Sequence, residues 1–142
     1  MFSREESKQI REQFWIFFGK RYPRKWLLYD TKVKEINLKF SFDNQKAMVS
    51  FDIETHDEVF REYYYDKFVS LKNLLKAEIS EDLILEKDFL RSSGKIISRV
   101  YITKPDVNIH NKKNWPEVFD FFYENMPKFE LFWYEYEDII KA

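Results

Sequence analysis

Apolar side chains recur at alternating spacings of four and three residues along the C-terminal part of the chain. This periodicity is typical of one face of an α-helix of about seven turns. Six of the eight side chains in this stripe are aromatic, so the stripe must be buried in the core of this chain or against a second copy of it. Its members are Trp115, Phe119, Phe122, Met126, Phe129, Trp133, Tyr136 and Ile140.

Pro127 falls inside this predicted helix, where it has no N–H to donate and would clash with the carbonyl of Tyr123. The stripe keeps its phase on both sides of Pro127, so we predict one kinked helix. Two helices that meet at residues 126–127 are the alternative.

Two segments in the first half of the chain alternate between apolar and polar residues. The apolar positions are Ile36, Leu38, Phe40 and Phe42 in the first, and Ala47, Val49, Phe51 and Ile53 in the second. The four polar residues 43–46 between them suit a turn, so the pattern predicts a β-hairpin with one buried face. A less regular pattern over about 83–102, with its turn at residues 92–95, predicts a second hairpin.

Capping signals mark the start of three helices. These pairs are Ser3 with Glu6, Thr55 with Glu58, and Asn114 with Glu117. We expect the first helix to end at Gly19 and the second to run from about 57 to 78. The order helix, hairpin, helix, hairpin, helix predicts an α+β fold of one domain, residues 1–142. Helices then cover one face of an antiparallel sheet made of two hairpins, in two layers.

Composition narrows the possible functions. The chain has no cysteine, which excludes disulfides, thiolate zinc sites, iron–sulfur clusters and cysteine nucleophiles. Its two glycines are too few for a P-loop or a dinucleotide fingerprint. Neither His56 nor His110 has a metal-ligand partner at a suitable spacing. The charged residues at the N-terminus and the lack of a long apolar run favour a cytoplasmic protein with no membrane partner.

Charge is spread unevenly along the sequence. Residues 1–50 carry 11 basic and 6 acidic side chains, whereas residues 114–142 carry 2 basic and 7 acidic ones. We call residues 1–50 the basic front and residues 114–142 the acidic tail. The two are expected to attract each other, within one molecule or between two.

Two carboxylates, Asp52 and Glu54, fall on one face of a predicted strand, a spacing that suits a divalent metal in some nucleases. Such a nuclease also needs an acid and a lysine two apart on the next strand, where this sequence has Glu86-Lys87-Asp88. The polar face of an amphipathic hairpin explains both acids, so we expect no catalytic, cofactor-binding or metal-binding residues.

One segment combines cations with aromatic side chains, as surfaces that bind nucleic acid do. This basic-aromatic segment consists of Lys20, Arg21, Tyr22, Arg24, Lys25 and Trp26. It is our candidate surface for nucleic acid or another partner. The alternative is a helix end and a loop whose aromatic side chains pack into the core.

Several segments together resemble an uncharacterised bacterial family, domain-of-unknown-function family 4268. They include Ile10-Arg11-x-x-Phe14-Trp15-x-x-Phe18-Gly19, Tyr29-Asp30-Thr31-Lys32-Val33-Lys34, Lys46-Ala47-x-Val49-Ser50-x-Asp52-Ile53-Glu54, Ser98-Arg99-Val100-Tyr101 and Trp115-Pro116-Glu117. Members of that family resemble the C-terminal part of longer proteins that begin with a restriction-type nuclease. The resemblance implies an accessory or recognition module, near nucleic acid or phage defence, and not the nuclease itself.

Our leading hypothesis is a non-enzymatic cytoplasmic module that binds another protein or a second copy of itself, as a homodimer. A nucleic-acid-associated accessory module is the alternative, and a small metal-dependent nuclease is the third hypothesis.

Overall fold

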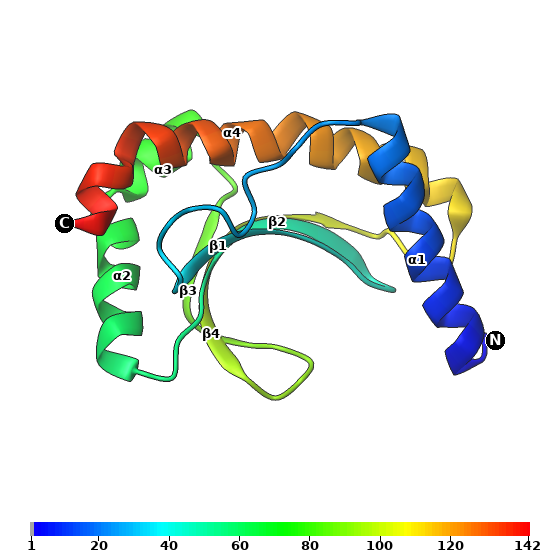
Figure 1. Ribbon diagram of the computed structural model, residues 1–142, viewed down its shortest axis with the longest axis horizontal. Helices are drawn as coiled ribbons and strands as arrows, with labels where there is room; N and C mark the ends of the chain where they lie inside the picture. Colours follow the sequence, from blue (N-terminus) through cyan, green and yellow to red (C-terminus); the bar gives the residue numbers. More distant parts are fainter. Residues whose placement is uncertain (1) are drawn as a thin grey trace.

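The computed structural model describes residues 2–142, which form a four-stranded antiparallel sheet with helices on one of its faces (Figure 1). The helices are α1 (Arg4–Arg21), α2 (Glu58–Ser70), α3 (Lys72–Glu78) and α4 (Trp115–Lys141), with a short 3-10 turn η1 (Lys112–Asn114) before α4. The strands are β1 (Ile36–Phe42), β2 (Lys46–Ile53), β3 (Ile84–Leu90) and β4 (Ile96–Pro105). Their order across the sheet is β1-β2-β4-β3. The predicted α+β order and the two antiparallel hairpins are confirmed.

The alternation of β1 and β2 sorts the sheet into two faces. Phe40 pairs with Val49, and Phe51 pairs with Leu38 on one side and Val100 on the other. These apolar side chains form the covered face, under the helices. The Phe51 ring lies 5.0 Å from Phe68 of α2 and 5.1 Å from Phe129 of α4, measured between ring centres. Aromatic packing of this kind joins the two layers.

The long C-terminal helix is confirmed as one element. All eight stripe residues are buried or half-buried, and most of them are fully inside the core. Pro127 lies within α4, which continues on both sides of it, so the alternative of two helices is wrong (Figure 1). Burial of a continuous aromatic face outweighs the single backbone hydrogen bond that Pro127 removes.

The second helix departs from the prediction at both its start and its middle. Asp57 caps α2 by accepting hydrogen bonds from the N–H groups of Val59 and Phe60, while Thr55 accepts one from the Asp57 N–H. The predicted helix over 57–78 breaks at Leu71, whose N–H bonds to the Phe68 carbonyl three residues back. The break leaves Phe68, Leu71 and Leu75 all buried in the core.

The other two caps differ in outcome. The Ser3–Glu6 capping box is present with both of its hydrogen bonds, at 3.1 Å each. Helix α1 continues through Gly19 to Arg21, and the Tyr22 N–H still bonds to the Phe18 carbonyl four residues back. Asn114 makes no capping bond, since its side-chain oxygen accepts from the Asn108 N–H of the preceding loop. None of the helices described is long and apolar enough to cross a membrane.

Candidate binding surface on the open face of the sheet

The face of the sheet turned away from α4 is covered by no helix in the described part of the chain (Figure 1). We call it the open face. It carries the polar positions of β1 and β2 and the alternate positions of β4. The side chains at the centre of this face, which we call its floor, are nevertheless buried, because the sheet curves and neighbouring side chains cover them. The floor residues are Met48, Ser50, Asp52, Ile97, Arg99 and Tyr101.

A charged network lies at the centre of this floor. Arg99 and Asp52 are cross-strand neighbours, and the guanidinium donates two hydrogen bonds to the carboxylate, from Nε and Nη2, each of 2.8 Å. Ser50 adds a third donor to Asp52, at 2.7 Å. A bidentate pair with further hydrogen bonds is the arrangement that makes a buried charge tolerable. The Arg99 guanidinium also lies 4.3 Å from the centre of the Phe89 ring.

The second predicted acid is also held by cations. Glu54 accepts hydrogen bonds from Arg91 at 2.6 Å and from Lys95 at 2.9 Å. The hydrogen bond from Lys95, with the charges of Lys95 and Arg91, lowers the pKa of Glu54 below its ordinary value. Asp52 and Glu54 therefore lie on the same face, as predicted, but each faces its own cations. Among residues 2–142, the His, Asp and Glu side chains form no group suited to a metal ion.

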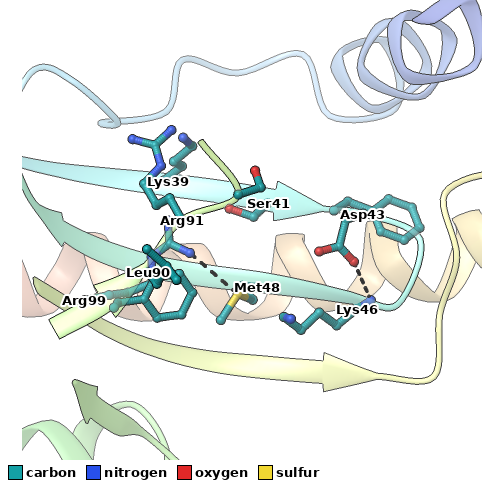
Figure 2. A pocket seen from close by; sticks show the side chains of 11 residues that line it. Lys39, Ser41, Asp43, Lys46, Met48, Leu90, Arg91 and Arg99 are labelled. Carbon is teal, nitrogen blue, oxygen red and sulfur yellow. Dashed lines mark hydrogen bonds between the residues drawn. The ribbon is translucent and has the colours of Figure 1, made fainter. Parts of the chain in front are cut away.

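Two hollows lie along the open face. The larger holds about 320 Å³ and lies between the β1–β2 and β3–β4 hairpins, lined by Lys39, Lys46, Arg91 and Arg99 among others (Figure 2). The smaller holds about 210 Å³ and lies beside Asp52, Glu54 and Tyr29. Lys39 and Arg91 line both hollows. Burial, followed by the charge of Arg91, lowers the pKa of Lys39.

The aromatic members of the basic-aromatic segment pack onto the molecule. Tyr22 stacks on Tyr123 of α4 with 4.2 Å between ring centres. Trp26 is half-buried, with its ring 5.2 Å from Phe40 and 6.0 Å from Phe18. Both rings thus have partners within the chain, as in the alternative interpretation of this segment.

The four cations of the segment differ in their contacts. Arg24 lies 3.9 Å above the Trp26 ring and forms a bidentate pair with the buried Glu130, at 2.8 and 3.0 Å. Lys20 and Arg21 are exposed at the end of α1, and the Lys25 side chain is 87% exposed. Three of the four cations therefore remain accessible without a buried acid as partner, and the two aromatic rings of the segment are half-buried.

The cluster of cations on the open face was not predicted from the sequence, because these cations come from distant segments. Lys39 is on β1, Lys46 begins β2, Arg91 follows β3 and Arg99 is on β4. A signal was present in β2, where Ser50 and Asp52 alternate within a strand that is otherwise apolar. That alternation shows that the second face carries polar groups, but strand pairing is needed to name their partners.

The sequence that forms these two faces matches one known protein family. The family model described as Domain of unknown function (DUF4268) matches residues 10–137. The chain belongs to this family. The DUF4268 match covers all four strands, α2, α3 and most of α1 and α4, and it includes all residues of the open-face network. No curated protein and no solved structure matches the chain. Its function is therefore inferred from the geometry and chemistry of the site.

Proposed function

We propose that this DUF4268 protein is a non-enzymatic interaction module that binds a partner protein on the open face of its sheet. The observation that carries the proposal is the Asp52–Arg99 pair. A buried ion pair with two direct hydrogen bonds lies on a face that no described helix covers. A buried ion pair adds little net stability to the isolated chain. On an uncovered face, its fixed charges instead favour specific recognition of a partner with complementary charges.

The rim of the open face supports binding as well. Leu90 is 65% exposed at the edge of the larger hollow, and Tyr29 is 70% exposed at the edge of the smaller one. Exposed apolar side chains that gather beside a hollow commonly mark a surface that docks another molecule.

A binding role suits the acids better than catalysis does. Asp52 and Glu54 each accept strong hydrogen bonds from guanidinium or ammonium groups. A carboxylate so engaged is poorly placed to act as a general base or to share a metal ion. A cytoplasmic location is part of the proposal, in keeping with 35% of charged residues.

Capture from native lysate, with nuclease treatment, tests the proposal when matched variants are compared. The open-face variant is Lys39→Glu/Lys46→Glu, because neither lysine forms an ion pair within residues 2–142. The control variant, Lys72→Glu/Lys128→Glu, makes the same charge change at exposed positions of α3 and α4. We expect wild type and control to retain one partner protein that the open-face variant loses. Equal retention by all three chains, or no specific protein, would contradict the proposal.

A nucleic-acid-associated accessory role is the second candidate, through Lys20, Arg21 and Lys25. The observation that favours it is their exposure at one end of α1 and in the loop that follows. Partners that disappear from the capture on nuclease treatment would favour this role and its link to restriction-type nucleases or phage defence.

A further inference from the structure

We propose that the larger hollow, between the two hairpins, binds an oxyanion carried on a small apolar body. The oxyanion is a carboxylate or a phosphoryl group. This proposal rests on the proposed function, since the oxyanion is then the group by which the partner is recognised on the open face.

The hollow is the right size for one such group. Its volume of about 320 Å³ is at the lower end of the range of pockets for small ligands. Figure 2 shows that β1, the β1–β2 turn and the segment after β3 all contribute side chains to it. It therefore suits a side chain or a small molecule rather than a folded domain.

One buried donor in its lining has no oxygen acceptor. Arg99 is only 5% exposed, and its Nε and Nη2 atoms are used by Asp52. The remaining nitrogen, Nη1, has the Met48 sulfur as its one hydrogen-bond partner in the described chain, at 3.8 Å (Figure 2). A thioether is a weak acceptor, whereas a guanidinium N–H bonds strongly to an anionic oxygen. An oxyanion in the hollow would give this donor a proper partner.

Two lysines at the hollow form no ion pair in the described chain. Lys39 and Lys46 line it from neighbouring strands, and none of the salt bridges of residues 2–142 includes either of them. The pKa of Lys39 is lowered by burial and by the charges of Arg91 and Arg99. A bound anion would offset both effects, so the charged form of Lys39 would stabilise the complex.

Counting charges gives a surplus of positive charge around the hollow. Five cations lie in or beside it, against four acids. Asp52 and Glu54 already bind guanidinium groups, Asp43 accepts two backbone N–H bonds in the β1–β2 turn, and Glu86, the cross-strand neighbour of Arg99, accepts the Tyr101 hydroxyl. The cations are Lys39, Lys46, Arg91, Lys95 and Arg99. The surplus of positive charge favours the binding of an anion.

The same hollow has an apolar side. Met48, Phe89 and Leu90 line it together with the lysines. A bare inorganic ion would leave these side chains in water, whereas a ligand with a ring or a short aliphatic body would cover them. This mixed lining is the reason for an apolar body next to the oxyanion.

Isothermal titration of the full chain with three probes tests the proposal. Phenyl phosphate and benzoate carry the two oxyanions on the same ring, and benzyl alcohol is the neutral control. We expect at least one anionic probe to bind, with an affinity that falls as salt is added. Benzyl alcohol should bind much more weakly. The stronger anionic probe tells the two oxyanion classes apart.

Variants assign the binding to the hollow. Lys39→Met/Lys46→Met should weaken the anionic probe about tenfold or more, because two charge-assisted contacts are lost. The matched control, Lys72→Met/Lys128→Met, should bind like wild type. Both double variants keep every ion pair described here, so their fold should be unaffected, and circular dichroism checks this.

Failure of the two proposals can be told apart. No binding of either anionic probe, or equal binding by wild type and Lys39→Met/Lys46→Met, would overturn the oxyanion site even if a partner is captured on the open face. Probe binding that depends on Lys39 and Lys46 would support the site even if lysate capture yields no partner protein, and only the proposed function would then fail.

Discussion

The Arg24 guanidinium reaches Glu130, 106 residues away in the sequence, with its Nη2 atom 2.8 Å from Oε1 and 3.0 Å from Oε2. Glu130 also accepts the backbone N–H of Leu27 at 2.7 Å. Glu130 is a buried acid of the tail, and Arg24 belongs to the basic front. For this pair, the attraction predicted between the two ends of the chain acts within one molecule.

Removing Arg24 should therefore affect stability more than its place in an irregular segment suggests. Arg24→Ala leaves the buried Glu130 carboxylate with the Leu27 N–H alone, and we expect a loss of about 1–3 kcal/mol in the free energy of unfolding. Urea titration measures it. The control is Lys25→Ala, next in sequence but exposed, for which the change should stay within about 0.5 kcal/mol. Equal effects of both substitutions would mean that the Arg24–Glu130 pair contributes nothing.

The aromatic stripe of α4 should dominate the stability of the core. Phe129→Ala or Phe122→Ala empties a fully buried site and should cost about 3–5 kcal/mol. Leu131 on the same helix is 66% exposed, and Leu131→Ala should cost less than about 1 kcal/mol. Chemical denaturation of the three variants decides the matter. A loss below about 1 kcal/mol for the Phe variants would contradict the assignment of this stripe to the core.

The sequence predicted those parts of the fold that depend on local periodicity. The 4–3 spacing of α4 and the alternation of β1 and β2 each follow from one segment alone, and both were confirmed. The break at Leu71 has no side-chain cap to mark it, and α1 passes through Gly19 although glycine is a common helix end, so local capping rules misplaced both boundaries. The open-face cluster depends on strand order, because Arg99 meets Asp52 only when β4 pairs with β2.

Acid should weaken the contact between Glu54 and its two cations. The pKa of Glu54 is lowered, first by the Lys95 hydrogen bond and then by the charges of Lys95 and Arg91. A lowered pKa stabilises the folded state above the ordinary value of 4.5, and this contribution is lost as the pH falls through the folded-state pKa. The difference in unfolding free energy between wild type and Glu54→Gln should thus be largest near neutral pH and shrink in acid.

Urea titrations at roughly pH 7, 5 and 3 measure that difference. Lys95→Met removes the largest cause of the pKa shift and should also reduce the pH dependence. A difference that stays constant over the whole range would show that Glu54 is not stabilised by these cations.

Nucleic-acid binding, if it occurs through the basic-aromatic segment, should depend on its three accessible cations. Replacing Lys20, Arg21 and Lys25 together with Gln should weaken binding to short DNA or RNA and flatten its dependence on salt, because fewer counterions are released. Arg24 is left in place because it pairs with Glu130. Fluorescence anisotropy at several salt concentrations gives the slope. No binding by wild type at low salt would rule the segment out.

Self-association remains a prediction, and the structure shows which residues would carry it. Four aromatic side chains lie away from the main apolar stripes of the helices and need cover of their own. Phe132 is buried and Phe121 is half-buried, whereas Trp15 is 36% and Tyr134 is 61% exposed. Trp15 lines a shallow apolar hollow of about 210 Å³ together with Tyr29 and Phe40. An exposed apolar patch of this kind commonly marks an interface.

Sedimentation over a range of micromolar concentrations tests whether two copies pair through the Trp15–Tyr29 patch. We expect a species of about twice 17.6 kDa to grow with concentration, since a two-fold contact places the same patch on both copies. Tyr29→Glu puts a charge into this patch and should shift the equilibrium to the monomer. Tyr134→Glu makes the same change at another exposed tyrosine and should leave it unchanged. A single species near 17.6 kDa at every concentration would contradict the homodimer and leave the patch to a different partner.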